Sequence, residues 1–171
     1  MKKIILFIAM IFSAVLVNAQ SKTVVDIAKN SGNHTILVRA IVAADLAESL
    51  EGKGPFTVFA PTNEAFENLP KGALNKLLEE ENKQKLRGIL KYHVVPGKID
   101  AAAVVAAVKE GKDKAVLTTV QGAELTAMLE GNNVVLIDAA GNKAKVTATD
   151  LNGSNGVVHV IDKVLMPKAR K

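Results

Sequence analysis

The stretch from Gly54 to Phe66, which reads GPFTVFAPTNEAF, restricts the possible folds of this chain more than any other part of it. Gly54-Pro55 predicts a turn, because proline fixes φ and has no backbone N–H to donate. The apolar, β-branched and aromatic run Phe56–Ala60 is typical of a strand that is covered on both faces. Pro61 should end that strand, since it cannot pair within a sheet. We therefore expect the fold to be built around a buried strand at Phe56–Ala60.

A helix is expected directly after this strand, over residues 62–69. Thr62 or Asn63 can accept a hydrogen bond from a free N–H of the first turn, and Glu64 suits the positive end of the helix dipole. Apolar residues at helical spacing predict further helices over residues 23–28, 34–50, 74–78, 82–90 and 100–111. Asp100 is expected to cap the last of these helices. The first half of the chain is thus expected to be mainly helical.

From Ala115 onward the pattern changes to an alternation with a period of two, which is typical of strands. Five strands are predicted: Ala115–Val120, Glu124–Glu130, Val134–Asp138, Lys143–Asp150 and Val157–Val164. Short turns connect them, which makes most of these neighbours antiparallel. The closing segment Asn155–Pro167 has the same make-up as the first strand, with a turn before an apolar run and a proline after it. Both strands should therefore be central in the sheet.

The first 19 residues have the pattern of an export signal. Lys2 and Lys3 precede the apolar run Ile4–Val17, and small residues at Val17 and Ala19 predict cleavage before Gln20. The alternative, a helix that stays in the membrane, would need roughly 20 apolar residues, and this run is shorter. We expect a single domain over residues 20–167, a basic tail over residues 168–171, and no membrane span once the signal is removed.

Charge and cysteine content exclude several classes of function. Removal of Lys2 and Lys3 lowers the net charge from +5 by two, and no basic run is interleaved with aromatic residues, so nucleic acid is not expected as a partner. The chain has no cysteine, which excludes disulfides, thiol redox chemistry and cysteine-rich zinc sites. A domain of about 150 residues can be stabilised by core burial alone.

Histidines are the first candidates for a metal site. The chain has three, His34, His93 and His159, and imidazole is a common zinc ligand. No two of them have the short spacing of a local binding motif, and His93 and His159 lie in apolar runs. We interpret them as structural residues with hydrogen-bonded rings, and we expect neither a metal nor another cofactor.

Catalysis by a nucleophile is not expected either. The serines after the signal are Ser21, Ser31, Ser49 and Ser154, and none lies in a Gly-x-Ser-x-Gly turn between a strand and a helix. The glycines beside Ser154 lack the spacing of a phosphate-binding loop, and a strand rather than a helix follows them. The sequence therefore predicts a protein that is not an enzyme.

Three motifs relate the chain to a known family. They are residues 54–66, residues 92–98 (YHVVPGK) and residues 155–162 (NGVVHVID). In these motifs and their order the chain resembles a single fasciclin-type domain, also called FAS1, and weaker likeness extends from Thr23 to Pro167. The resemblance implies an α+β fold, a β-wedge of about seven strands with several helices packed mainly from the N-terminal half. Phe56–Ala60, Val94–Ile99 and the five late strands make seven.

The family resemblance also implies a function. Fasciclin-type domains usually serve adhesion or matrix interaction in secreted and surface proteins. We accordingly expect a non-enzymatic, exported module that binds an extracellular protein or a polysaccharide without a cofactor, in the periplasm, on the outer surface or in the medium. The alternative is a periplasmic carrier that holds a small or lipidic ligand in an apolar pocket between wedge and helices.

Candidate interaction residues follow from the same resemblance. In animal members of the family, a Tyr-His pair that matches Tyr92 and His93 is proposed to contact integrins. A second proposed site there is an Asp-Ile pair, and Asp150 and Leu151 occupy that position here, with leucine departing from the pattern. The alternative for Tyr92 and His93 is that they pack inside the domain. Integrins are not expected as partners, because the short signal indicates a bacterial source.

Overall fold

The computed structural model describes residues 22–168, so the predicted export signal and the last three residues of the basic tail lie outside the described residues. Seven α-helices and two short 3₁₀ segments are present in the described part: α1 (Val24–Lys29), η1 (Gly32–His34), α2 (Thr35–Ala43), α3 (Ala47–Glu51), α4 (Asn63–Glu67), α5 (Ala73–Leu78), η2 (Glu80–Asn82), α6 (Lys83–Tyr92) and α7 (Ala101–Glu110). The strands are β1 (Phe56–Pro61), β2 (Val94–Pro96), β3 (Lys114–Thr118), β4 (Glu124–Glu130), β5 (Asn133–Ile137), β6 (Lys143–Gly153) and β7 (Gly156–Ile161).

All seven strands form one sheet in the order β2-β1-β7-β6-β5-β4-β3. The first and last strands of the chain, β1 and β7, lie side by side and are parallel, with Phe56 opposite Gly156 and Phe59 opposite His159. Every residue of β7 and all but the first of β1 are buried. The prediction of two central strands is confirmed.

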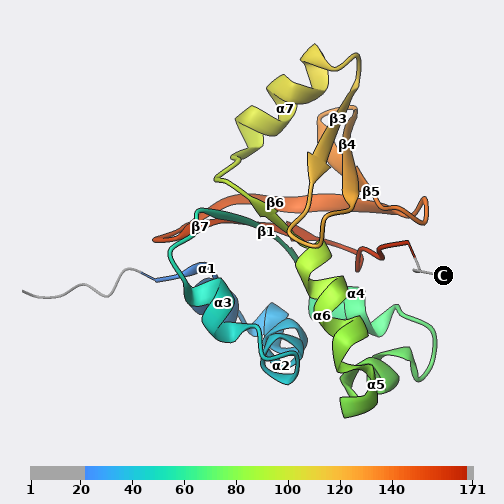
Figure 1. The fold of residues 1–171 in the computed structure, drawn as a ribbon. Helices are drawn as coiled ribbons and strands as arrows, with labels where there is room; N and C mark the ends of the chain where they lie inside the picture. The colour runs from blue at the N-terminus through green and yellow to red at the C-terminus, as the bar shows by residue number, and fades with distance from the viewer. Residues whose placement is uncertain (1–21, 169–171) are drawn as a thin grey trace, which may run out of the picture.

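The sheet is folded into a wedge at β6. This long strand pairs with β5 near its start and with β7 further along, and its register shifts on both sides of Ala148. Such irregularities bend a strand and increase its twist. As a result β3 and β4 stand upright over β1 and β7 (Figure 1), and the two ends of the sheet approach each other. There the Val120 N–H donates to the Val94 carbonyl oxygen at 2.7 Å.

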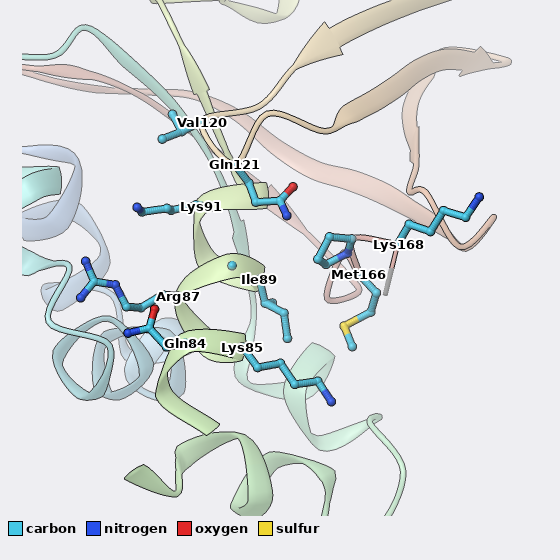
Figure 2. Close-up of a pocket in the computed structure, with 11 residues that line it drawn as sticks. Gln84, Lys85, Arg87, Ile89, Lys91, Val120, Gln121, Met166 and Lys168 are labelled. Atoms are coloured by element: carbon cyan, nitrogen blue, oxygen red, sulfur yellow. The ribbon is translucent and has the colours of Figure 1, made fainter. Parts of the chain in front are cut away.

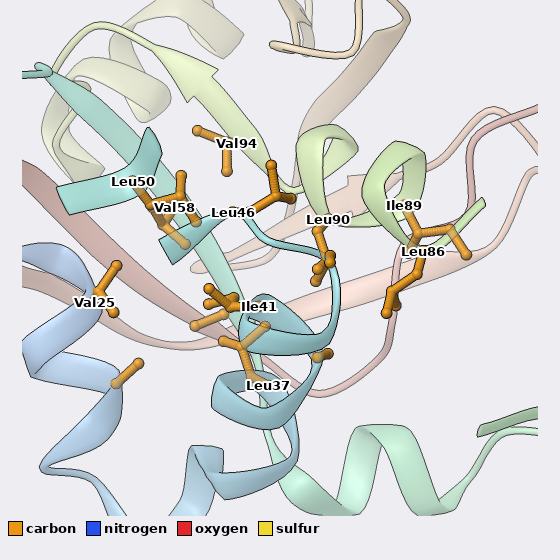
Figure 3. Packing of buried hydrophobic residues seen from close by; sticks show 14 of the residues in the cluster. Val25, Leu37, Ile41, Leu46, Leu50, Val58, Leu86, Ile89, Leu90 and Val94 are labelled. Atoms are coloured by element: carbon orange, nitrogen blue, oxygen red, sulfur yellow. The ribbon is translucent and has the colours of Figure 1, made fainter. Parts of the chain in front are cut away.

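Two apolar cores flank the central strands. The first lies between the sheet and the helices of the N-terminal half, where Leu37, Ile41 and Leu90 point toward Val58 of β1 (Figure 3). The second fills the wedge around Phe59 of β1, and α7 covers it with buried apolar side chains. Since β1 and β7 separate the two cores, their side chains are buried on both faces.

The predicted caps at the starts of α4 and α7 are confirmed. The Thr62 side chain accepts a hydrogen bond from the Ala65 N–H at the start of α4, and Asp100 accepts one from the Ala103 N–H at the start of α7. Asn63 does not cap α4 but links it to α2: its amide oxygen accepts from the Ile36 N–H.

The long helix expected over residues 34–50 is wrong. The structure has α2 and α3 instead, separated by Asp45, which has a positive φ of 49°. The Leu46 N–H donates to the Ile41 carbonyl oxygen in this turn, and the Leu46 side chain is buried. A straight helix would not place Ala44 and Leu46 on one buried side, so packing rather than local propensity ends α2.

Some strand boundaries also differ from the prediction. The strand expected at Val94–Ile99 is only the short β2, because the Ile99 N–H donates to the Thr57 side-chain hydroxyl rather than to a backbone carbonyl of β1. β6 continues beyond the predicted end at Asp150 to Gly153. β7 ends at Ile161 rather than Val164, although Val164 is still buried.

Candidate functional site

Tyr92, a candidate contact residue, lies at the end of α6 with its side chain fully buried. Its hydroxyl donates to the Glu124 carbonyl oxygen at 2.7 Å and accepts from the Ala139 N–H at 3.0 Å. Burial raises the pKa of Tyr92, since the charged phenolate would lose its hydration. The hydroxyl thus connects α6 to β4 and to the turn after β5, inside the fold.

His93 is equally enclosed. Its Nδ1 lies 2.8 Å from the Ile89 carbonyl oxygen, and its Nε2 lies 2.9 Å from the Leu165 backbone nitrogen. A backbone N–H can only donate and a carbonyl can only accept, so the ring is neutral with its proton on Nδ1. Burial lowers the pKa of His93 to about 4, which agrees with that neutral form.

His159 links the interior to the other candidate pair. Its ring stacks on Phe59, and its Nε2 donates to the Ile99 carbonyl oxygen at 2.8 Å. Its Nδ1 accepts from the Asp150 N–H at 3.3 Å. Asp150 has a positive φ of 60°, which is uncommon for residues other than glycine. The buried histidine therefore helps hold the backbone of Asp150 in an unusual conformation.

Asp150 and Leu151 themselves lie on the surface of β6. The Asp150 carboxylate accepts from the Ala101 N–H at 2.9 Å, at the start of α7, and Leu151 is 39% exposed. The structure thus places Tyr92 and His93 in the interior and leaves Asp150 and Leu151 accessible. A contact by the exposed pair stays a prediction.

The three histidines each have separate partners. Nδ1 of His34 is 2.9 Å from the Ser31 hydroxyl oxygen, whereas His93 and His159 bond to the groups described above. Burial lowers the pKa of His34 as well. Within residues 22–168, no three histidine or carboxylate side chains lie in a group that could hold a metal ion.

An open groove of about 560 Å³ follows the exposed side of α6 (Figure 2), and we name it the α6 groove. One side is α6 itself, from Gln84 to Lys91. The opposite side consists of Val120 and Gln121, in the turn between β3 and β4, and the C-terminal segment Met166–Lys168. Three segments that are far apart in the sequence thus meet at this groove.

Positive charge dominates the α6 groove. Its cationic side chains are Lys85, Arg87, Lys91 and Lys168. In the described part of the chain none of them forms an ion pair, unlike the neighbouring Lys83, which contacts Asp45 at 2.7 Å and Glu80 at 3.2 Å. Arg87 is close enough to Asp45 to contribute to the lowered pKa of that carboxyl, after the larger effect of Lys83. The groove also exposes Val120, at 44%.

Sequence reasoning missed this groove, although part of its signal is visible in the sequence. The segment Lys83–Lys91 reads KQKLRGILK and combines a basic helix face with the isolated Gly88. The contribution of Val120 and Met166–Lys168 has no local signal, because only the tertiary fold brings them beside α6.

The apolar pocket that a carrier would need is small. A pocket of about 60 Å³ lies between helices and wedge, bordered by apolar side chains that include Leu50, Phe56 and Val94. Pockets for small organic ligands typically measure roughly 300–1,000 Å³. This pocket therefore does not support the carrier alternative. In addition, none of the helices within residues 22–168 combines the length and apolar character of a membrane-spanning segment.

Comparison with known proteins gives related sequences over most of the chain. A family model described as the fasciclin domain matches residues 32–167. The chain is 46% identical over 145 residues to Protein sll1483 of Synechocystis sp., covering 85% of this chain and 73% of that protein. It is 41% identical over 149 residues to the transforming growth factor-beta-induced protein ig-h3 of Sus scrofa, covering 87% of this chain and 20% of that protein. It thus corresponds to most of the first protein and to a small part of the second.

A solved structure has the same architecture. The chain is similar to a FAS1 domain pair from the insect cell adhesion molecule fasciclin I, with a TM-score of 0.75 and 20% sequence identity. The match covers 87% of this chain and 51% of that one. At this identity the likeness concerns the fold, and it confirms the predicted α+β wedge of seven strands with helices mainly from the N-terminal half.

Proposed function

Because the chain belongs to the fasciclin domain family, we propose that it is a non-enzymatic, exported module that binds an extracellular protein or a polysaccharide through its exposed surface. The observation that carries this proposal is the family match over residues 32–167. The solved relative of the same fold, described as part of an insect cell adhesion molecule, supports an adhesive role.

The bonding of the buried polar residues supports a role without catalysis. Both ring nitrogens of His93 and of His159 are engaged by backbone groups, so neither ring has a free nitrogen to act as a general base. Ser154 lies in the exposed turn between the strands β6 and β7, whereas a nucleophilic serine of the Gly-x-Ser-x-Gly type lies between a strand and a helix. The two histidines therefore stabilise the fold, and we expect the exposed surface to bind the partner.

The α6 groove is our leading candidate for the contact surface. It combines cations that form no ion pair within residues 22–168 with exposed apolar atoms in a concave site, and such a combination is typical of binding surfaces. Asp150 and Leu151 form a second candidate surface, since both are exposed on β6.

A binding survey tests the proposed function. Purified protein is applied to intact cells of the source organism, to immobilised matrix proteins and to a glycan array, with heat-unfolded protein as the control. We expect saturable binding to at least one of these surfaces by the folded protein only. Absence of binding to all three, or turnover in a broad hydrolase screen, would contradict the proposal. Fractionation of the source cells tests export, because the protein should be in the periplasm, on the outer surface or in the medium.

A further inference from the structure

Gly88 is a glycine in the interior of α6 that packing does not require. A Cβ atom built at this position has open space around it. At Gly111 and Gly156, by contrast, a Cβ would collide with the carbonyl oxygens of Lys114 and Phe56. Glycine weakens a helix interior relative to alanine, because it loses more backbone freedom on folding. Stability therefore does not explain glycine at position 88.

The position of Gly88 in the α6 groove offers a reason. Residues three and four apart share one face of a helix, so Gln84, Lys85 and Lys91 surround Gly88 on the groove side. Figure 2 shows the side chains of Lys85 and Lys91 extending to either side of this part of the helix. A glycine at such a place lets the main chain of a ligand approach the helix closely.

The charge and the apolar surface of the groove indicate which class of ligand it could bind. Lys85, Arg87 and Lys91 form no ion pair within the described residues and would attract an acidic ligand, although Arg87 lies near Asp45. Val120 and Met166, on the opposite side, offer apolar surface. An acidic polysaccharide would pair with the cations but has no apolar side chain to cover this surface. Gln121 also borders the groove, and its buried Oε1 has no hydrogen-bond partner among the described residues.

We propose that the α6 groove binds an extended, acidic peptide segment of a partner protein. The main chain of the segment crosses α6 at Gly88, its carboxylates pair with Lys85, Arg87 and Lys91, and an apolar side chain lies against Val120. This inference rests on the proposed function as an interaction module, and it names the class of ligand and the surface.

The test uses a fluorescent peptide of alternating glutamate and leucine as the probe, with fluorescence anisotropy as the readout. A peptide of alternating lysine and leucine is the charge control, and heparin represents an acidic polysaccharide. We expect the glutamate–leucine peptide alone to bind, more weakly at high salt because ions screen the charges. In a spectrum of ¹⁵N-labelled protein, the amide signals of Gly88 and Val120 should shift on binding.

Gly88→Ala is the decisive variant, because stability and binding should change in opposite directions. The added methyl group strengthens the helix and raises Tm, yet it obstructs the groove and weakens peptide binding by about tenfold. Gly32→Ala is the matched control: its Cβ also meets open space, outside the groove, so peptide affinity should not change. Lys91→Glu should abolish peptide binding, whereas Lys109→Glu, the same charge change on α7, should leave most of it.

Several outcomes would overturn the inference. These are no binding of the glutamate–leucine peptide, unchanged affinity in Gly88→Ala and Lys91→Glu, or preferential binding of heparin in the same groove, which would identify a polysaccharide as the occupant. Binding to cells or matrix that is insensitive to both groove variants would refute the groove and leave the proposed function standing. No binding to cells, matrix or glycans would refute the proposed function even if the peptide binds.

Discussion

The imidazole of His159 stacks on the ring of Phe59, with the ring centroids 5.7 Å apart and the planes inclined by 28°. The two residues are opposite each other on the parallel strands β1 and β7. His159 also bonds to Ile99 and to Asp150. Through these three contacts, His159 connects the centre of the sheet to the segment that leads to α7 and to the surface of β6.

Phe59→Ala should strongly destabilise the protein. Phe59 is 1% exposed, and truncation of a buried phenylalanine leaves a cavity that costs about 3–5 kcal/mol of unfolding free energy. Urea unfolding measures the loss, with Phe59→Leu as a control that should cost less because most of the volume is kept. A loss below about 1 kcal/mol for Phe59→Ala would show that this ring does not support the core.

Stability should decrease at acid pH because of His93. The pKa of His93 is about 4 in the folded state, against about 6.5 for an unperturbed histidine, so below pH 6.5 the unfolded chain binds a proton that the folded protein does not bind. The free energy of unfolding is therefore not reduced by His93 above pH 6.5. It decreases as the pH falls from 6.5 toward 4, by about 3 kcal/mol in total.

Urea unfolding at pH 7, 5.5 and 4 measures this loss. The variant His93→Gln should be less stable at pH 7 and should show a smaller decrease with acid. Part of the decrease should remain, because burial lowers the pKa of His34 in the same direction. An equal pH dependence in both proteins would contradict the assignment to His93.

Tyr92→Phe separates a structural role from a contact role. The change removes a buried hydroxyl that donates to Glu124 and accepts from Ala139, which should cost about 1–3 kcal/mol of unfolding free energy. Thermal unfolding measures this cost. Because Tyr92 is fully buried, the folded variant should bind cells or matrix like the unmodified protein. Normal stability together with lost binding would instead identify Tyr92 as a contact residue.

Asn155→Ala should be among the most damaging polar substitutions. The buried Asn155 side chain accepts from the Val24 N–H and donates to the Leu50 and Gly52 carbonyl oxygens. Its loss leaves these backbone groups without partners, which should cost about 2–3 kcal/mol or more. Chemical unfolding measures the difference. The exposed Asn132→Ala is the control, and it should change stability by less than about 0.5 kcal/mol.

Much of the fold could be predicted from local pattern. The apolar runs of β1 and β7, the caps at Thr62 and Asp100 and the alternation in β4 depend on neighbouring residues only, and each was predicted correctly. The helix over residues 34–50 was predicted wrongly, because the turn at Asp45 depends on burial of Leu46 by distant parts of the chain.

The candidate site was less accessible to sequence reasoning. Tyr92 and His93 lie between a helix and an apolar run, a pattern that is more often found in a core than in a surface contact but is compatible with both. Their burial follows from bonds to Glu124 and Leu165, which lie tens of residues further along the chain. The α6 groove likewise needs Val120 and Met166 beside α6, and no spacing rule connects these residues.

By itself, the sequence determined most of the strands and helices and the family to which the domain belongs, because periodicity, caps and motifs are properties of consecutive residues. The tertiary structure alone decided that β1 lies parallel to β7, that Tyr92 and His93 are enclosed, and that a basic groove opens along α6. The physical reason is that packing and hydrogen bonding between distant segments decide which side of each element meets solvent.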